Sequence, residues 1–323
     1  MVSVLCGLLF IRFALFLCLQ LVQDQPLLRS NVHLYIKTAP QEMRLRSEAR
    51  QNWLKCFSKI GISHRFVLGE APLLEQEELL EGEQRIHHDL LLFHSFSDKY
   101  YSVWNKLSTL YRWHQANYGT EPMLVVDIDG NVFPSGLQHF LIKHRAMLNR
   151  AKQTIAGTCS CNDELTILPF RTSSFYFPPC LATKRSLFLP LRNKTVKFFT
   201  SYDVWQPKFF PNYCFGYSQL ILPGSQQRFG DQLAGSFRAF DPETKLKLND
   251  DTVSGFFKRT LNISFLSYPH YFQTIDMLTG VFVENIHKCL KTGSRCISLH
   301  THGYVDNRKI WNVYLRRNGC SSY

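Results

Sequence analysis

The sequence predicts an α/β fold, with a mixed, mostly parallel central sheet flanked by helices. Two observations support this prediction. Between residues 32 and 148, segments with the two-residue alternation of strands are repeatedly followed by segments with the spacing of helices, a pattern typical of strands joined by helical crossovers. In addition, 45% of the 323 residues are hydrophobic and 14% are aromatic. This composition is enough for a sizeable core and excludes a disordered or fibrous protein.

Each expected element follows from a local pattern. Apolar or alternating residues predict strands at 32–37, 65–69, 90–93 and 123–126. Apolar residues at helical spacing predict helices at 44–57, 100–118 and 137–148, and an acidic run predicts an exposed helix or loop at 75–83. Further along, the composition predicts an irregular region at 159–190, an aromatic turn at 209–217 and an apolar run at 220–222.

The stretch from Met123 to Phe133 is the most informative part of the chain. Four apolar residues run into Asp127 and Asp129, which are two positions apart and are followed by a turn. Ligands bind at the carboxyl ends of strands in open α/β sheets, and side chains two positions apart on a strand point to the same side. Two converging carboxylates repel each other unless a divalent cation offsets their charge. The stretch therefore predicts a metal or ligand site, and an ordinary Asp/Gly/Asn turn is the alternative.

A second pair of carboxylates, Asp250 and Asp251, comes just before an expected helix. Asp250 would be a normal N-terminal cap for this helix, which is the alternative to a functional role. Because the chain already has one acidic strand end, the second pair favours a site that both pairs share.

The N-terminal segment predicts entry into the secretory pathway. From Val2 to Val22 the only charged residue is Arg12, and the segment is long enough to span a bilayer as a helix. We expect a retained type II anchor at residues 1–22, a short stem at 23–31 and a lumenal domain at 32–323. Cleavage of the segment followed by secretion is the alternative.

Cysteines and glycosylation sequons agree with a lumenal domain. Two of the ten cysteines, Cys6 and Cys18, lie in the apolar segment, and the remaining eight are an even number. We expect them to form disulfides, whose connectivity the sequence leaves open. Asn193 and Asn262 begin glycan acceptor sequons.

The charge of the chain restricts its partners. The formal net charge is +12, but the lysines and arginines are scattered, without a long basic run or a basic patch interleaved with aromatic residues. This distribution excludes a basic surface along which the protein would bind nucleic acid. The excess charge is compatible with an anionic small ligand or with an ordinary solvated surface.

A series of short motifs follows one another after residue 32. They are the helix Arg46–Trp53 with its Arg-x-x-x-Arg-x-x-Trp pattern, the strand 66–69, the stretch 87–91 followed by Asp98, Tyr100 and Lys106, the acidic strand end 127–129, the block 197–216 and the block 250–255. In this order they resemble the β-1,3-galactosyltransferase and fringe group, glycosyltransferase family 31. The similarity extends over most of the chain after residue 32.

This resemblance implies a GT-A type nucleotide-sugar-binding fold, with a nucleotide-sugar half at 32–135 and an acceptor-binding, catalytic half at 136–323. It implies a single-pass type II protein of the Golgi membrane. The implied reaction is inverting transfer of a galactose or N-acetylhexosamine type sugar from a UDP-sugar to a hydroxyl of a glycan acceptor on a glycoprotein or glycolipid. A β-1,3 linkage and the use of Mn²⁺ or Mg²⁺ are also implied.

The resemblance assigns a metal site and a base. Asp127, Asp129 and His270 would hold the metal, and three further histidines compete with His270 for the last place: His287, His300 and His302. Asp251, with Asp250 next, would take the proton of the acceptor hydroxyl.

The resemblance also assigns nucleotide-sugar binding to a group of charged residues. These are Arg46, Arg50, Asp89, Lys106 and Asp127. For the two arginines, a surface or ion-pairing role is the alternative.

The acidic strand end departs from the family pattern in three ways. Ile128 stands where the family has a middle acid, Val125 or Val126 replaces a lysine, and Gly130-Asn131 is inserted before Val132. The chain therefore resembles a divergent member of this family, and we expect that its metal affinity or donor choice can differ.

Two other functions compete with a transferase. The stretch 124–132 also resembles the first motif of haloacid-dehalogenase-type phosphatases, in which Asp127 would be the nucleophile and Mg²⁺ the cofactor. The motif lies mid-chain behind a folded region, which is unlike those enzymes. The other alternative is a transferase-like lumenal protein that binds glycans or partners without turnover.

Overall fold

The computed structural model describes residues 32–99, 102–119, 121–145, 154–159, 213–222, 262–268, 270–274, 282–291, 295–301 and 307–318, together with 224, 225 and 228. The chain divides into two units, Met1–Asn31 and Val32–Tyr323, and all described residues belong to the second. None of the helices within these ranges is both long and apolar enough to cross a bilayer. The predicted anchor at residues 1–22 lies outside the described ranges.

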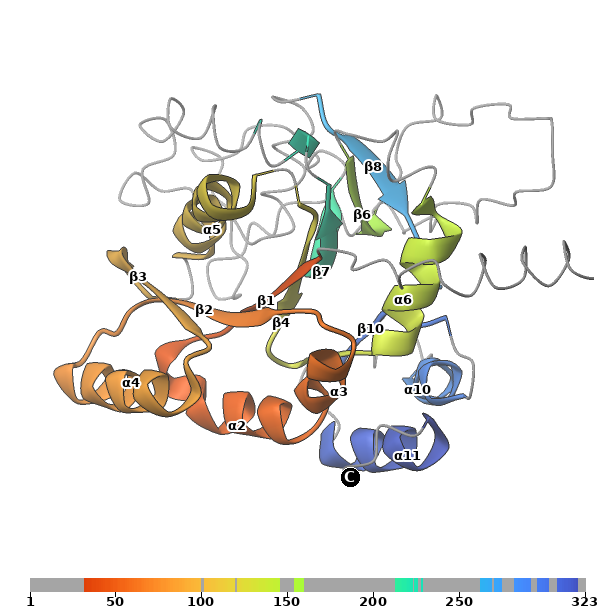
Figure 1. Ribbon diagram of the computed structural model, residues 1–323, viewed down its shortest axis with the longest axis horizontal. Coiled ribbons are helices and arrows are strands. Elements are labelled where there is room, and N and C mark those ends of the chain that lie inside the picture. Colours follow the sequence, from red (N-terminus) through yellow and green to blue (C-terminus); the bar gives the residue numbers. More distant parts are fainter. Residues whose placement is uncertain are drawn as a thin grey trace, which may run out of the picture. The chain divides into compact units, whose positions relative to one another are not determined.

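A seven-stranded mixed sheet forms the centre of the second unit (Figure 1). Its order is β3-β2-β1-β4-β7-β6-β8. The strands are β1 (His33–Lys37), β2 (His64–Glu70), β3 (Leu90–Ser97), β4 (Met123–Asp127), β6 (Thr154–Cys159), β7 (Cys214–Ile221) and β8 (Ser264–Ser267). The first four in chain order are parallel to one another, β7 is antiparallel to both of its neighbours, β4 and β6, and β8 is parallel to β6. The predicted mixed, mostly parallel sheet is confirmed.

A small second sheet follows directly on β4. It has the order β5-β10-β9 and consists of β5 (Gly130–Val132), β9 (Phe272–Thr274) and β10 (Ser298–His300). Because β5 begins three residues after β4 ends, the acidic stretch connects the two sheets.

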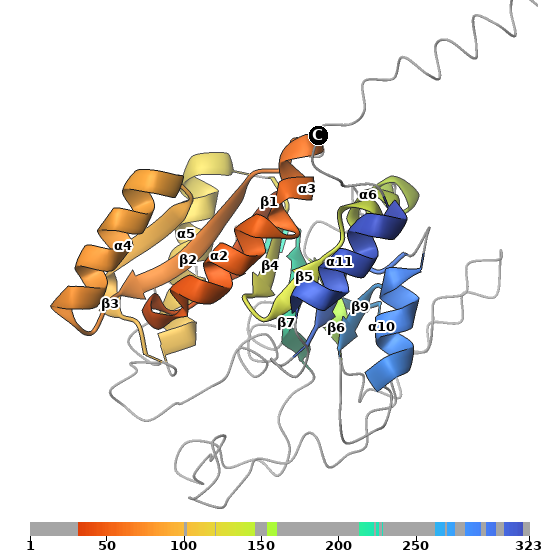
Figure 2. The ribbon, with the colours of Figure 1, turned by 90° about the horizontal axis from the view of Figure 1, so that it is seen from below.

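Helices flank both the large and the small sheet (Figure 1 and Figure 2). They are α2 (Met43–Gln51), α3 (Leu54–Lys59), α4 (Leu74–His87), α5 (Val103–Tyr118), α6 (Pro134–Lys143), α10 (Phe282–Leu290) and α11 (Asn307–Asn318), with a 3₁₀ turn at Pro40–Glu42. Figure 1 shows α2 and α4 on one side of strands β1–β3 and α5 on the other. Figure 2 shows α10 and α11 lying side by side next to the small sheet.

The alternation within β1 explains these two layers. Leu34 and Ile36 belong to the core that also contains residues of α2 and α4, whereas Tyr35 packs into the core under α5. Successive side chains of a strand point to opposite faces, so a strand covered on both sides is apolar throughout.

Three expected elements differ from the observed ones. The helix expected at 44–57 is divided at Asn52, whose side-chain amide donates a hydrogen bond to the carbonyl of Glu48 at 2.6 Å and so competes with the helical ladder. The helix expected at 137–148 begins earlier, with Pro134 in its first turn, and ends at Lys143. Residues 214–217, expected in a turn, are the start of β7. Residues 209–212 lie outside the described ranges.

Disulfides are present, as the sequence predicts. Cys159 is bonded to Cys214, which joins β6 to β7, and Cys289 is bonded to Cys296, which joins α10 to the segment before β10. Helix α6 packs tightly on this second segment, because a Cβ on Gly136 would lie 1.8 Å from the carbonyl oxygen of Cys296. The chain leading to β10 is thus held from two sides.

Candidate functional site

Three side chains with metal-binding atoms converge where the two sheets meet. Asp127 ends β4, Asp129 lies in the turn after it, and His300 ends β10. The Nε2 atom of His300 lies 2.9 Å from Oδ1 of Asp129 and 3.9 Å from Oδ2 of Asp127. One ligand atom from each residue lies within 4.8 Å of the others. We call these residues the acid–histidine cluster.

The register of the strands explains why these three residues meet. In the large sheet β1 runs parallel to β4 with Lys37 opposite Asp127, and the N–H of Ile128 donates to the carbonyl of Lys37 at 3.0 Å. In the small sheet β10 runs antiparallel to β5, with His300 opposite Gly130. The inserted Gly130-Asn131 pair is therefore the beginning of β5, and it is this strand that brings His300 to the acids.

The C-terminal helix secures the inserted residues. The indole Nε1 of Trp311 on α11 donates a hydrogen bond to Oδ1 of Asn131 at 2.6 Å, and both side chains are buried. A buried hydrogen bond of this kind is costly to break, because the remaining polar group loses its partner without gaining water.

The imidazole and the turn are held by Thr301 and Tyr217. Thr301 donates two hydrogen bonds to the carbonyl of Asp129, from its hydroxyl at 2.7 Å and from its backbone N–H at 3.3 Å. The ring of Tyr217 on β7 stacks on the ring of His300, with centroids 5.0 Å apart and planes within 3° of parallel. These contacts orient the ligand side chains before any ion binds.

The two acids of the cluster are accessible and the histidine is not. The side chains of Asp127 and Asp129 are 29% and 32% exposed, whereas that of His300 is 8% exposed. Burial alone would lower the pKa of His300, but the hydrogen bond that Nε2 donates to Asp129 and the negative charges of Asp129 and Asp127 raise this pKa above its ordinary value. Protons and a metal ion would therefore compete for Nε2, since only the neutral imidazole binds metals.

A buried lysine lies beside the cluster. The Nζ atom of Lys37 forms an ion pair with Oδ1 of Asp127 at 2.8 Å and donates a hydrogen bond to the carbonyl of Gly216 at 2.9 Å. Its side chain is only 7% exposed. No sequence motif singled out Lys37, although its position at the end of a strand that pairs with β4 is a usable signal.

The donor set of the cluster fits a divalent cation. Carboxylates suit Mg²⁺ and Mn²⁺, while imidazole suits transition metals. Two carboxylates and one imidazole therefore fit a transition ion such as Mn²⁺ better than Mg²⁺.

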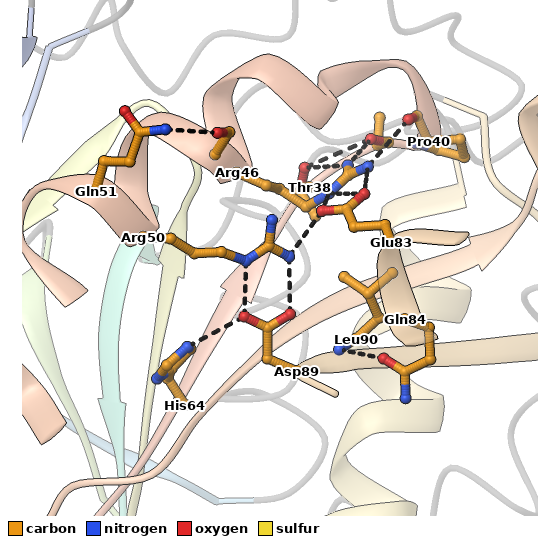
Figure 3. Close-up of polar contacts among 12 residues, drawn as sticks. Thr38, Pro40, Arg46, Arg50, Gln51, His64, Glu83, Gln84, Asp89 and Leu90 are labelled. Carbon is orange, nitrogen blue, oxygen red and sulfur yellow. Dashed lines mark hydrogen bonds and ion pairs between the residues drawn. The ribbon is translucent and has the colours of Figure 1, made fainter. Parts of the chain in front are cut away.

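Four of the residues predicted to bind the nucleotide sugar lie elsewhere, and two of these are Arg46 and Arg50 of α2 (Figure 3). The fully buried Arg46 contacts both carboxylate oxygens of Glu83, at 2.9 and 2.6 Å, and donates to the carbonyl of Ala39 at 2.7 Å. Glu83 belongs to the acidic segment that the sequence predicted to be exposed, but it is buried, because two arginines of α2 offset its charge.

Arg50 extends the same set of ion pairs to the start of β3. Its guanidinium binds both oxygens of Asp89, at 2.8 and 2.7 Å, and lies 2.7 Å from Glu83. Although burial opposes ionisation, the hydrogen bonds from Arg50 and His64 lower the pKa of Asp89 to about 2. We call Arg46, Arg50, Glu83 and Asp89 the buried arginine network. In the described structure it holds α2 against α4 and β3, and the predicted contact of its members with a nucleotide stays a prediction.

Lys106 lies near the carboxyl ends of the parallel strands. Its Nζ atom pairs with Asp98 at 2.9 Å and donates to the carbonyl of Thr38, directly after β1. Asp98 also accepts a hydrogen bond from the N–H of Gly69 at 2.8 Å. Burial lowers the pKa of Lys106, and the negative charge of Asp98, which favours the protonated lysine, offsets only part of this decrease. This pair links α5 to β1 and β2 at the edge of the sheet where ligands bind in α/β folds.

The remaining predicted residues lie apart from the cluster. The predicted bases Asp250 and Asp251 are outside the described ranges. His270 is exposed in the turn before β9 and is not a member of the cluster. The histidine that the structure places beside the acids is His300, one of the three competitors named from the sequence.

The sheet and its acid-bearing central strand define an α/β protein of the nucleotide-sugar-binding type, and comparison with known proteins gives its family. The family model described as Galactosyltransferase matches residues 44–269. Because this match covers most of the chain, the protein belongs to the galactosyltransferase family and is a glycosyltransferase. The predicted GT-A type fold agrees with this membership, and the phosphatase alternative is set aside.

Solved glycosyltransferase structures resemble the chain at low identity. One is a glycosyltransferase involved in the glycosylation of the major capsid of PBCV-1, with 10% identity, a TM-score of 0.40, and coverage of 88% of this chain and 98% of that one. Another is the galactosyltransferase LgtC in complex with donor and acceptor sugar analogues, with 8% identity, a TM-score of 0.42, and coverage of 90% and 96%. A third is mouse xyloside xylosyltransferase 1, with 9% identity, a TM-score of 0.37, and coverage of 85% and 99%. No curated protein sequence gives a significant match.

Proposed function

We propose that the protein is an inverting hexosyltransferase. It moves a galactose or N-acetylhexosamine type sugar from a UDP-sugar to a hydroxyl of a glycan, forming a β-1,3 linkage. The observation that carries this proposal is the convergence of Asp127, Asp129 and His300 at the carboxyl end of β4, in a chain of the galactosyltransferase family. This is the edge at which α/β sheets bind nucleotides.

The acid–histidine cluster would hold Mn²⁺ or Mg²⁺. A bound divalent cation supplies positive charge where negative charge develops on the departing diphosphate. The protein's own contribution is orientation. Thr301 holds the carbonyl of Asp129, and the ring of Tyr217 lies parallel to that of His300, so the donor atoms need little rearrangement.

A carboxylate is needed on the acceptor side of the sugar. We assign this role to Asp251, with Asp250 next, because of their place in the family motif at residues 250–255. The carboxylate takes the proton of the acceptor hydroxyl while that oxygen forms a bond to C1 of the sugar. The bond between C1 and the diphosphate breaks on the opposite face, so the configuration at C1 is inverted.

A donor screen tests this proposal. The purified full chain should show a thermal shift with UDP or with a UDP-sugar when Mn²⁺ is present, and it should transfer sugar to a glycan acceptor. Both effects should be lost in Asp129→Ala and kept in Arg44→Ala, which alters an exposed residue of α2. If no UDP-sugar gives a shift or transfer, the proposal is wrong. Binding of glycans that survives the change of both acids would instead support a non-enzymatic binding protein.

We also propose that the protein is a single-pass type II protein of the Golgi membrane, anchored by residues 1–22. Two observations support a lumenal domain. The disulfides Cys159–Cys214 and Cys289–Cys296 are typical of oxidising compartments. Asn262, which begins a sequon, is exposed in a turn just before β8.

Expression of the full chain in a eukaryotic secretory host tests this location. Glycosidase treatment should lower the mass of the wild type by more than that of Asn262→Gln, and the protein should resist extraction from membranes at alkaline pH. Appearance of a shortened chain in the medium would favour secretion. A chain without glycans that stays in the cytosol would contradict the proposed location.

A further inference from the structure

Large exposed hydrophobic side chains gather on one helix. Among the residues that the structure describes, five large hydrophobic side chains are exposed, and four of these lie on α4 or directly before it: Leu73, Leu74, Leu79 and Ile86. The fifth, Ile142, lies on α6. Helix α4 packs against β3, the outer strand of the large sheet (Figure 1). Single exposed hydrophobic residues are ordinary, whereas a group of them on one element indicates a contact surface.

Two of these residues share one face of α4 with a glycine between them. Leu79, Gly82 and Ile86 are separated by three and four positions, and a helix places residues at this spacing on one face. Leu79 and Ile86 are 57% and 73% exposed, whereas Leu80, which faces the core, is 1% exposed. We call Leu79, Gly82 and Ile86 the α4 stripe.

Packing within the chain does not explain the glycine at the centre of the stripe. A Cβ on Gly82 would find only Nη2 of Arg85, at 4.0 Å, which is an ordinary contact. Glycine also weakens the interior of a helix compared with alanine. The distance between two packed helices depends on the side chains at their contact, so a glycine allows the backbone of a second helix to approach closely.

The charges beside the stripe match a second copy of the same helix. Glu78 and Arg85 are exposed and lie two helical turns apart on one flank of the stripe. Within the part of the chain that the structure describes, neither forms an ion pair. If two copies of α4 pack antiparallel about Gly82, twofold symmetry places Glu78 of each copy opposite Arg85 of the other. The same symmetry places Leu79 of each copy next to Ile86 of the other.

We propose that α4 is the contact surface of a twofold dimer, in which the α4 stripes of two copies of this chain pack antiparallel about Gly82. A uniformly basic partner would match Glu78 but repel Arg85, whereas a second α4 matches both charges. The proposal concerns a surface outside the acid–histidine cluster and does not rest on the proposed function.

Sedimentation equilibrium of the full chain in density-matched detergent tests the dimer. Helix α4 has 14 residues and is therefore about 21 Å long. Two helices of this length form a small interface, so we expect a dissociation constant in the micromolar range. Between about 1 and about 100 µM protein, the average mass should rise from that of one chain towards that of two.

Substitutions in the stripe and on its flank test the geometry. Leu79→Glu should raise the dissociation constant of the dimer by at least about tenfold, because it places a charge in the apolar contact. Ile142→Glu is the matched control on α6 and should dimerise as the wild type does. Glu78→Arg and Arg85→Glu should each weaken the dimer by about tenfold, because each places like charges opposite one another twice. The double variant should restore the affinity to within about twofold of the wild type.

This restoration reports on a contact between copies. Seven positions along one helix correspond to about 10 Å, so Glu78 and Arg85 of the same copy are too far apart to form an ion pair. A purely structural role for either side chain predicts no restoration by the double variant.

Three outcomes would overturn the proposal. A wild type that stays monomeric over the whole concentration range excludes the dimer and leaves α4 to a different partner. A dimer that Leu79→Glu and Ile142→Glu affect equally must use another surface. If the double variant is as weak as the single ones, the antiparallel arrangement is wrong. Circular dichroism checks that each variant is folded, and the charge exchange decides the matter even if Leu79→Glu does not fold.

Discussion

The acid–histidine cluster and the buried arginine network contain the same kinds of charged groups but differ in how these groups are balanced. In the network, each carboxylate is bound by arginine, and the side chain of Arg46 has no exposed surface. In the cluster, two carboxylates remain about one-third exposed, and the buried Lys37 forms an ion pair with one of them, Asp127. The difference indicates two uses of carboxylates. Buried carboxylates whose charge is offset by arginines stabilise the fold, whereas partly exposed carboxylates whose charge is only partly offset are suited to bind a cation.

The largest effect is expected from breaking the network. Arg46→Met leaves Glu83 buried with one partner fewer, so the free energy of unfolding should fall by about 3–5 kcal/mol. Urea denaturation measures this change. Arg44→Ala is a matched control on the same helix, because Arg44 is 77% exposed, and it should change stability by less than about 0.5 kcal/mol. Equal effects of the two substitutions would remove the distinction between the network and the surface.

A change in the cluster should act on activity instead. Asp129→Ala removes a proposed ligand, and the rate of sugar transfer should fall by about 100-fold or more, which corresponds to about 3 kcal/mol. Its free energy of unfolding should change by less than about 1 kcal/mol, because the side chain is partly exposed. Steady-state kinetics and urea denaturation of the same preparation check both statements. A variant that loses stability but keeps its rate would show that the cluster belongs to the scaffold.

A smaller effect is expected where the scaffold supports the cluster. Thr301→Val keeps the shape of the side chain but removes the hydroxyl that donates to the carbonyl of Asp129 at 2.7 Å. The affinity for Mn²⁺ in the presence of UDP should fall by about tenfold, as is typical when a supporting hydrogen bond is lost. Calorimetry measures the Mn²⁺ affinity. An unchanged affinity would show that the hydrogen bond from the backbone N–H of Thr301 is sufficient to hold the carbonyl of Asp129 in place.

The smallest expected effect is a pH dependence of the free energy of unfolding, which arises from the ion pair between Asp89 and Arg50 in the buried arginine network. The pKa of Asp89 is lowered to about 2, so its ion pair with Arg50 stabilises the fold above the ordinary carboxyl pKa and is lost as the pH falls from about 4 to about 2. Allowing for solvent screening, the contribution is about 1 kcal/mol. Urea denaturation at pH 6 and pH 3 should show a smaller difference between wild type and Asp89→Asn at the lower pH. A difference that does not depend on pH would contradict the role of the carboxylate charge.

The sequence predicted the parallel half of the sheet because its strands carry strong patterns. Each of β1 to β4 is apolar or alternating over most of its length, which local periodicity detects. The strands β9 and β10 have three residues each, too few for any period, and neither was expected. β10 pairs with β5 and β9 pairs with β10, and β5 appeared in the sequence only as an insertion at Gly130-Asn131.

The two acids of the candidate site could be predicted from the sequence, but the side chains that contact them could not. Asp127 and Asp129 are adjacent to one apolar strand, so local sequence is enough to find them. His300 could be named only as one of several competing histidines, since its place depends on the register between β10 and β5. Glu83 was expected at the surface because an acidic run is usually solvated, and only the arginines 37 and 33 positions earlier in the chain explain its burial.

The pairing of β10 with β5 also has a consequence for protein synthesis. His300 follows Asp129 by 171 positions, and Trp311 follows Asn131 by 180. Because a chain leaves the ribosome from its N-terminus and can begin to fold during translation, strands β1 to β4 can assemble long before the imidazole is made. A nascent or prematurely terminated chain that stops before residue 300 therefore contains both acids and Lys37 but lacks the histidine of the acid–histidine cluster.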